Sequence, residues 1–494
     1  MDKHKQHISV ANRQAECLTA PMLFPDMCSQ PVVADFSGGH LSSDGGALLL
    51  GQIDRGLGLS ELLAGCFEDR RNPHLIEHSA EELVRQRLFG MALGYEDLND
   101  HADLRRDPLL AVAVGKNDVL GGKRRMPKDR GAACASPATL NRLELGAQFD
   151  DRYRKLKADP QKVEMALVEA GVRCLPADQE VMVLDFDATD MPLHGEQEEG
   201  FFHGYYDSYC YLPLYCFCGA VPLWAQLRPA GIDASEGTIE ALKKIVPIIR
   251  RRFPKVKIIV RSDSGFTREE IMAWCEGQKD IYYLFGIARN PRIEGLLTEA
   301  MVRARMRCCL VGISCREFVD SDYRTIQSWS CSRRLLGKAE ALANGKSNPR
   351  AVITNIPAAG LRGSDGMLLI EGSAASLYEN DYCGRGRAEN MIKQMTLDLK
   401  ADRVSSHWMA ANQMRLWFAA FAYLLLERLR SVALCGGELA TATLGSVRLR
   451  LLKVAAAIKL SARRLHVAFC SAFPLQDVFR KTQERLSQLQ KAPA

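Results

Sequence analysis

The chain has 494 residues, of which 47% are hydrophobic and 25% are charged, as is usual in globular proteins. This composition excludes a wholly disordered, collagen-like or coiled-coil protein, and the length allows about two to four domains. The 65 Lys and Arg outnumber the 59 Asp and Glu, which gives a formal net charge of +6. So small an excess indicates a nucleic-acid partner only where the positive charges cluster.

Targeting signals are not expected. Residues 1–20 contain no apolar run of signal-peptide length, and the rest of the chain has no stretch of about 18 apolar residues. The 16 cysteines include no C-x-x-C pair that would indicate a zinc site. We therefore predict a cytoplasmic protein without a membrane partner, whose thiols are mostly free.

Residues 1–150 are predicted to form a helical region. A helical pattern covers 47–53, and Ser79 and Glu82 form a capping box that opens a second helix. The segment 115–130 then changes character, because it combines glycines with five basic residues. It is either a solvated linker or an arm that contacts phosphates, and its basic residues are Lys123, Arg124, Arg125, Lys128 and Arg130.

From residue 180 the pattern changes to strands. Apolar runs over 181–187, 209–217 and 221–227 predict an antiparallel meander. A helix over 235–253 follows, with Pro247 expected to kink it. Strands over 255–263 and 281–287 are separated by a short helix that Thr267 and Glu270 would cap, so we expect these two strands to pair in parallel.

The pattern beyond residue 290 is irregular and strand-rich. Strands are predicted over 308–313, 324–329 and 351–356, and helix resumes at Ser376. Residues 416–427 predict a long, largely buried helix. The alternation over 447–451, followed by Lys453, Lys459, Arg463 and Arg464, predicts an amphipathic basic hairpin, with a helix as the alternative.

Carboxylates gather where two of the predicted strands end. Asp185, Asp187 and Asp190 lie at the end of the first strand, and Asp263 ends the fourth. Ligands collect at strand ends in open sheets, and paired carboxylates suit Mg²⁺. A third carboxylate would complete a two-metal site. Acids at strand ends are, however, also common as turn formers and helix caps.

A third acid is indicated by the pattern Tyr-x2-Arg-x3-Glu, formed by Tyr382, Arg385 and Glu389. Arg385, Glu389 and Lys393 are spaced four apart, so they line one helix face. With this pattern the chain resembles the DDE transposases of bacterial insertion sequences. The resemblance is carried by residues 42–46, 94–100, 184–190, 192–195, 201–206, 261–266 and 385–398.

The resemblance implies an α/β fold. Within these transposases, the chain resembles the group that has an RNase H-like (retroviral-integrase-like) catalytic core with a β-rich insertion between the second Asp and the Glu. A helical N-terminal DNA-binding region is expected to precede this core. The expected boundaries are 1–150 for the DNA-binding region, 176–290 for the first part of the core, 291–375 for the insertion, 376–432 for the Glu-bearing helices and 433–494 for a basic C-terminal region.

The same resemblance implies that Asp187, Asp263 and Glu389 hold two Mg²⁺ ions, with Mn²⁺ as a substitute. Asp187 is preferred to Asp185 and Asp190 because the family's x-Thr follows it directly. Asp185 lies two residues earlier on the same strand face, where it would support Asp187. The family expects Lys seven residues after the Glu, where this chain has Thr396, so Lys393 becomes the candidate for phosphate contact.

Further residues are candidates for supporting or DNA-contacting roles. Tyr382, Arg385, Asp190, His194 and His203 are expected near the metal ligands or the scissile phosphate. For the two histidines we favour the simpler interpretation, in which they orient the Asp187 strand by hydrogen bonds. Trp329, in the insertion, would stack on a flipped base of a DNA hairpin, or it belongs to the core.

The predicted function is cut-and-paste DNA transposition. The protein would bind terminal inverted repeats, hydrolyse phosphodiesters at the element ends and transfer the 3′-OH ends to target DNA. Synapsis of two ends implies a homodimer, in bacterial cytoplasm and associated with the nucleoid when bound. The alternatives are a metal-dependent nuclease of RNase H-like fold and a catalytically inactive DNA-binding relic.

Overall fold

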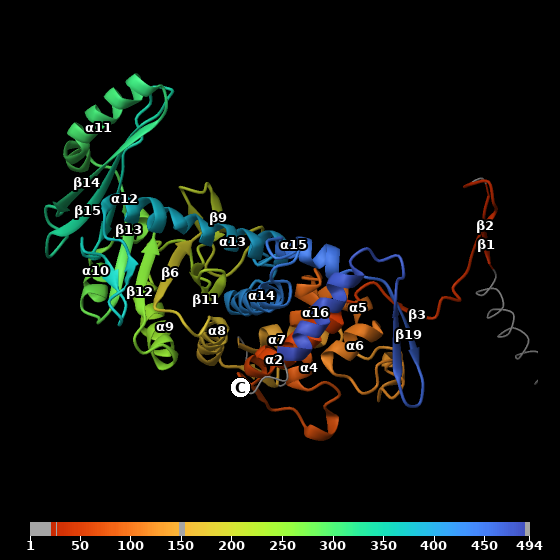
Figure 1. The fold of residues 1–494 in the computed structure, drawn as a ribbon. Helices are drawn as coiled ribbons and strands as arrows, with labels where there is room; N and C mark the ends of the chain where they lie inside the picture. The colour runs from red at the N-terminus through yellow and green to blue at the C-terminus, as the bar shows by residue number, and fades with distance from the viewer. Residues whose placement is uncertain (1–20, 26, 148–153, 490–494) are drawn as a thin grey trace, which may run out of the picture.

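The computed structural model describes residues 21–25, 27–147 and 154–489. The expected absence of a signal peptide from residues 1–20 falls outside them. An eight-stranded mixed sheet dominates one half of the molecule (Figure 1), with strand order β11-β10-β6-β12-β13-β16-β15-β14. Its strands are β6 (Val181–Ala188), β10 (Leu214–Cys218), β11 (Val221–Gln226), β12 (Lys257–Ser262), β13 (Ile281–Ile287), β14 (Cys315–Tyr323), β15 (Arg333–Ala341) and β16 (Arg350–Thr354).

The centre of this sheet is parallel. β6 pairs with β12 and β12 with β13 in parallel, whereas β10, β11 and β14–β16 join antiparallel. The predicted parallel pair and meander are therefore confirmed. The predicted strand 209–217 is wrong in one respect, because it divides at Pro213, which has no N–H to donate to a ladder. Its first part is β9 (Ser208–Tyr211), which forms a small sheet with β7 (Met191–Pro192) and β8 (Phe201–His203).

Helices pack against this part of the sheet: α8 (Pro160–Cys174) and α14 (Met409–Arg428) on β11, α10 (Glu269–Glu276) on β13 and α13 (Gly386–Leu399) on β6, with α9 (Thr238–Arg252) against α8. The predicted helix with an internal Pro247 is confirmed as α9. The predicted cap of the short helix is wrong. Thr267 donates its hydroxyl to the carbonyl of Gly286 instead, and α10 begins one residue after Arg268.

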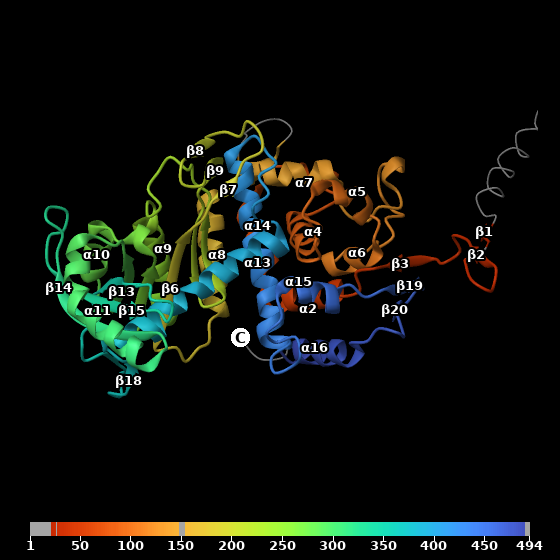
Figure 2. The same ribbon diagram turned by 90° about the horizontal axis from the view of Figure 1, so that it is seen from above.

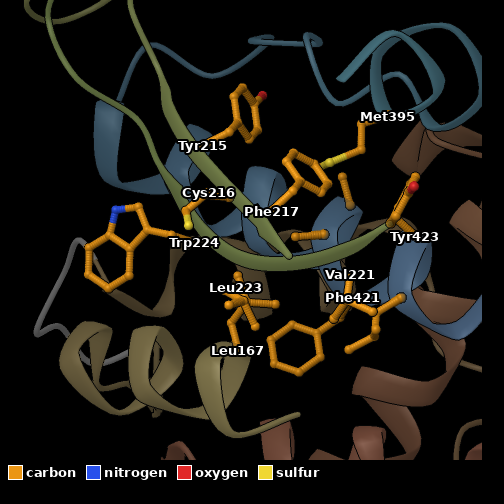
Figure 3. Close-up of a cluster of buried hydrophobic side chains, with 14 of the residues drawn as sticks. Leu167, Tyr215, Cys216, Phe217, Val221, Leu223, Trp224, Met395, Phe421 and Tyr423 are labelled. Atoms are coloured by element: carbon orange, nitrogen blue, oxygen red, sulfur yellow. The ribbon is translucent and has the colours of Figure 1, made fainter. Parts of the chain in front are cut away.

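Helix α14 is the buried axis of the molecule, as the long apolar pattern predicts. Figure 3 shows how β10 and β11 pack on it: Phe217 meets the ring of Tyr423 edge-on, with ring centroids 6.1 Å apart, and Met395 of α13 lies in the same cluster. On the other side, Leu223 packs with Leu167 of α8. Each such buried side chain contributes roughly 1.5–3 kcal/mol. This cluster holds α13 against the sheet.

The segment after β13 extends the same sheet. It begins with α11 (Pro291–Val311), at the far end of the molecule in Figure 1, and ends with the small hairpin β17 (Leu361–Arg362) and β18 (Leu368–Ile370). The strand predicted over 351–356 is confirmed as β16. Those over 308–313 and 324–329 are wrong: residues 308–311 form the largely exposed last turn of α11, whose buried residues Ile293, Leu297, Ala300 and Ala304 recur at helical spacing, and 324–329 form a loop after β14.

The N-terminal region is helical, and Ser79 and Glu82 form the predicted capping box. Figure 2 shows α13 and α14 between the sheet and these helices. The helices are α2 (Ala47–Leu57), α3 (Leu59–Ala64), α4 (Ala80–Ala92), α5 (His101–Leu104), α6 (Pro108–Val114) and α7 (Pro137–Glu144), with short strands β1 (Met22–Phe24), β2 (Val32–Ala34), β3 (His40–Ser42), β4 (Phe67–Asp69) and β5 (Leu156–Ala158) and the 3₁₀ turns η1 (Pro73–Leu75), η2 (Leu98–Asp100), η3 (Pro127–Asp129) and η4 (Leu145–Ala147).

The C-terminal region folds back onto the N-terminal helices, because β19 pairs with β3 and α16 packs on α2. Residues 447–451 are helical, as the alternative predicts, since Leu444, Val447 and Leu451 are buried at helical spacing. A basic hairpin does form, but later in the chain, where β19 and β20 pair antiparallel around Lys459, Arg463 and Arg464. The elements are the π-helical turns η8 (Leu429–Ala433) and η9 (Arg448–Leu452), α15 (Leu444–Val447), β19 (Ala456–Leu460), β20 (Leu465–Phe469) and α16 (Gln476–Leu489).

Two further expectations concern cysteines and membranes. Every cysteine that the structure describes is a free thiol. Within the described ranges, none of the helices combines the length and the apolar character needed to cross a bilayer.

Candidate active site

Asp187 and Asp263 lie at the same end of two neighbouring strands. Asp187 is the penultimate residue of β6, and its Oδ1 accepts the N–H of Ala188 at 3.0 Å. Asp263 directly follows β12 and caps the 3₁₀ turn η5 (Ser264–Phe266), where its Oδ1 accepts the N–H of Gly265 at 2.9 Å. Because β6 and β12 are parallel neighbours, their carboxyl ends bring these two acids to one edge of the sheet.

Glu389 reaches this edge from α13. The helix is preceded by α12 (Ala374–Ser376), the π-helical turn η6 (Leu377–Tyr382) and the 3₁₀ turn η7 (Cys383–Arg385). Two glycines allow close contact with the strand ends. A Cβ on Gly384 would lie 2.7 Å from the guanidinium of Arg261, and one on Gly286 would lie 2.3 Å from the hydroxyl of Tyr382. Larger residues at either glycine would push the start of α13 away from β12 and β13.

The three carboxylates interact electrostatically. The pKa of Asp187 is raised to about 7, chiefly by burial and also by the negative charges of Asp263 and Glu389, while Arg385 opposes the rise. Arg385 forms an ion pair with Glu389, with Nη2 and Oε1 2.8 Å apart. Tyr382 is a further neighbour of Arg385 and of Asp263. Three carboxylates therefore share the positive charge of Arg385.

Asp185 has a different environment, although it is only two residues from Asp187. It is buried, and both of its oxygens accept hydrogen bonds from Arg261, at 2.5 Å from Nε and 2.8 Å from Nη2. Arg261 also donates to the backbone carbonyl of Asp381. Asp185 is thus occupied by a structural ion pair that ties β6 to β12 and to the segment before α13.

The other predicted neighbours of the acids are more scattered. Asp190 lies close to Tyr206, whose pKa is raised to about 12 by burial and by the nearby acids. His203 contacts the same tyrosine, with ring centroids 4.9 Å apart. His194 is exposed and lies near Asp402. Lys393 is exposed one turn after Glu389, at the rim of a cavity between α13 and η8.

Most of the predicted DNA-contacting loop is exposed. Lys123, Arg125, Lys128 and Arg130 face solvent. Arg124 does not, because it pairs with Glu77 at 3.2 Å and donates to the carbonyl of Ala132 at 2.7 Å. Its role in the described structure is to anchor the loop.

Trp329 is buried, with only 5% of its surface exposed. Its ring meets Tyr323 edge-on at 5.5 Å, and the guanidinium of Arg333 lies 5.4 Å from its centroid. A base could stack on Trp329 only after the loop 324–332 had moved.

Sequence reasoning missed two neighbours of the acids. Tyr206 lies close to Asp187 and Asp190, and Arg261 holds Asp185. A usable signal existed for Arg261, because a charged residue inside an otherwise apolar strand needs a buried partner.

The donor set fits a hard divalent cation. Carboxylate oxygens are the ligands that Mg²⁺ prefers, and the pKa of Asp187 is raised chiefly by burial, with the charges of Asp263 and Glu389 adding to the rise. In the part of the chain that the structure describes, no three His, Cys, Asp or Glu side chains are close enough together to form a metal cluster. Asp187, Asp263 and Glu389 therefore influence one another electrostatically, but their side chains are not as close as those of a metal cluster.

The fold and the site are those of a mixed α/β protein with acidic side chains at the end of its parallel strands. The family model for Transposase DDE domain group 1 matches residues 24–491. The chain belongs to this family of DDE transposases.

Comparison with curated proteins finds no match. Among solved structures, the chain is similar to the piggyBac transposase synaptic complex with hairpin DNA, at 12% sequence identity and a TM-score of 0.37, over 91% of this chain and 86% of that one.

Proposed function

We propose that the protein is a cut-and-paste DNA transposase whose active site is formed by Asp187, Asp263 and Glu389. The observation that carries this proposal is that the three acids interact electrostatically at the end of β6 and β12. They do so although Asp263 and Glu389 are 126 residues apart in the sequence. Membership of the DDE transposase family supports the reaction type, and the three carboxylates indicate where in the fold the reaction would take place.

The core is proposed to be RNase H-like. In support, β6, β12 and β13 form a parallel centre, and β10 and β11 continue it antiparallel on one side. Residues 176–290 and 376–432 would form this core, and 291–375 an insertion that lengthens its sheet. Residues 1–150 would bind the terminal inverted repeats, and 433–494 would support them.

Asp187, Asp263 and Glu389 would hold two Mg²⁺ ions, or Mn²⁺ in their place. Bound metals of this kind activate a nucleophile and stabilise the leaving oxygen of a phosphodiester. Arg385 would hold Glu389 in position through their 2.8 Å ion pair, with Tyr382 beside it. Asp185 would act only through Arg261, by fixing the strand that carries Asp187.

DNA would be held mainly through its phosphates. Lys123, Arg125, Lys128 and Arg130 offer exposed positive charge for this purpose, and Lys393 would contact phosphate beside Glu389. Two protein copies would hold two ends in a synaptic complex before the 3′-OH ends are joined to target DNA. In a bacterial cell the protein would then act in the cytoplasm, on the nucleoid when bound.

The proposal is tested by cleavage of a labelled duplex that carries the gene's own flanking inverted repeat, in the presence of Mg²⁺. Wild type should nick the duplex at the repeat end, and Asp187→Ala and Asp263→Ala should bind it without cutting. Joined products would separate a transposase from a nuclease, which gives none. Binding without cleavage by wild type would contradict the proposal and leave a DNA-binding relic.

A further inference from the structure

A hairpin rich in aromatic residues follows the first acid. It consists of β8, a turn and β9, and its sequence over 201–211 has six Phe or Tyr among eleven residues, against 7% aromatic residues in the whole chain. No Lys or Arg occurs between residues 193 and 211. The hairpin is therefore unsuited to following a phosphate backbone and needs another explanation.

Four of these six aromatic side chains are exposed, whereas Tyr206 is half-buried and Tyr211 is buried. In the β8–β9 register Phe202 lies opposite Tyr209, and their rings meet edge-on with centroids 5.5 Å apart. Tyr205, at the turn, is 86% exposed, and Tyr209 and Phe202 are 59% and 46% exposed. Exposing several aromatic rings on one short hairpin leaves a large apolar area in water, and such patches usually mark a binding surface.

The hairpin is anchored beside the candidate active site. β9 pairs with β7, which starts four residues after Asp187, and the turn places Tyr206 near Asp187 and Asp190. Tyr205 in turn contacts Tyr206, with ring centroids 5.0 Å apart. Figures 1 and 2 show this small sheet beside the end of β6. A ligand whose scissile bond reaches Asp187 would pass next to these rings.

The composition of the patch favours one kind of ligand. Residues 201–209 contain aromatic, small and polar side chains but no Leu, Ile, Val or Met, so the exposed apolar area of this hairpin consists of flat rings. Flat rings without positive charge suit the faces of nucleic-acid bases, which stack on aromatic side chains regardless of sequence. Bases expose their faces only when they are unpaired.

We propose that the aromatic hairpin (residues 201–209) is a stacking platform for unpaired bases of the DNA end at the active site. Tyr205, Phe202 and Tyr209 provide the rings, and Tyr206 connects them to the acids. This inference rests on the proposed function. It assigns to an exposed hairpin the role that the buried Trp329 cannot fill without a loop movement.

The test uses two labelled duplexes that carry the flanking inverted repeat, one fully paired and one with a short unpaired end containing 2-aminopurine. Binding and fluorescence are measured without divalent metal, so that no cleavage occurs. Wild type should bind the unpaired end more tightly and quench its fluorescence. Tyr205→Ala combined with Tyr209→Ala should weaken binding of the unpaired end by about 5- to 100-fold and leave the paired end unchanged.

Matched variants separate stacking from general damage. Tyr205→Phe combined with Tyr209→Phe keeps the rings and should behave as wild type. Leu310→Ala removes an apolar side chain that is 84% exposed on the distant α11. It should change the binding of neither duplex.

Three outcomes would overturn the inference. Equal loss of both duplexes, or no loss, in the Tyr205→Ala/Tyr209→Ala variant would show that the rings do not read unpaired bases. A change in oligomeric state in that variant would show that the patch binds a second copy. Failure of wild type to bind either duplex would contradict the proposed function itself, and is distinct from the first two results.

Discussion

Two buried carboxylates in this molecule differ in whether their charge is paired with guanidinium groups. Between α4, α7 and α14, Glu144 accepts Arg87 at 2.7 Å on one oxygen and Arg415 at 2.9 Å on the other, and all three side chains are less than 10% exposed. At the end of β6, Asp187 has no such partner, and its pKa is raised to about 7 chiefly by burial.

The difference separates structural charges from reactive ones. A carboxylate with a guanidinium on each oxygen has its negative charge satisfied, so it holds the fold together and is closed to ligands. A carboxylate buried beside other carboxylates retains an unmet need for positive charge, which a cation can supply. Asp185 and Asp187 repeat this contrast within one strand.

The largest expected effect is on catalysis. Asp187→Asn should lower the rate of DNA end cleavage by at least about 10³-fold, because a lost ligand removes several kcal/mol of transition-state stabilisation. Folding should not suffer, since the change removes a buried negative charge that repels Asp263 and Glu389. Cleavage assays and urea unfolding check both halves. A large loss of stability would place Asp187 among the structural charges.

The next effect is on stability alone. Glu144→Gln should destabilise the protein by about 3–5 kcal/mol, because it leaves Arg87 and Arg415 buried without their counter-charge. Urea unfolding measures the change. Glu68→Gln, at an exposed position, is the control and should stay within about 0.5 kcal/mol of wild type. A loss of less than about 1 kcal/mol in Glu144→Gln would mean that the ion pairs of Glu144 with Arg87 and Arg415 do not stabilise the helical region.

Asp185→Asn should have an intermediate effect, about 2–3 kcal/mol, because Arg261 keeps one hydrogen bond but loses its charge partner. Its residual cleavage should exceed that of Asp187→Asn when both are compared at a temperature where they are folded. Identical loss of cleavage at full stability would make Asp185 the ligand instead.

The smallest effect concerns pH. Burial lowers the pKa of His101 to about 3, with Arg87 adding to the shift. The unfolded chain then binds this proton more readily than the folded one, so His101 by itself contributes a loss of stability as the pH falls below about 6.5, of about 2 kcal/mol at pH 5. Unfolding at pH 7 and pH 5 tests this. His101→Gln should reduce the change in unfolding free energy between pH 7 and pH 5. His74→Gln, at an exposed position, should leave that change as in wild type.

The sequence predicts those features that depend on local pattern. The apolar runs 181–187 and 281–287 and the capping box at Ser79 define strands and a helix by themselves, and the motif around Glu389 identifies the family. Spacing alone fails where tertiary contacts decide. Residues 308–311 look like a strand but are helical because α11 buries one face on β14 and β15.

Side-chain burial is equally hard to foresee. Trp329 and the aromatic hairpin are both aromatic in sequence, yet one is packed under Arg333 and the other faces solvent. The pairing of Asp185 with Arg261 depends on the β6–β12 register, which no local pattern specifies. The three acids could be proposed from motifs, but their partners required the fold.

The metal site at the end of β6 and β12 is tested most directly by Mn²⁺ binding to the protein on the repeat-end duplex, monitored by electron paramagnetic resonance. Wild type is predicted to bind Mn²⁺, and Asp187→Asn and Asp263→Asn to lose that binding while Glu144→Gln, where folded, retains it. Unchanged binding in both aspartate variants would contradict the account, because the acids at the end of β6 and β12 would then hold no metal.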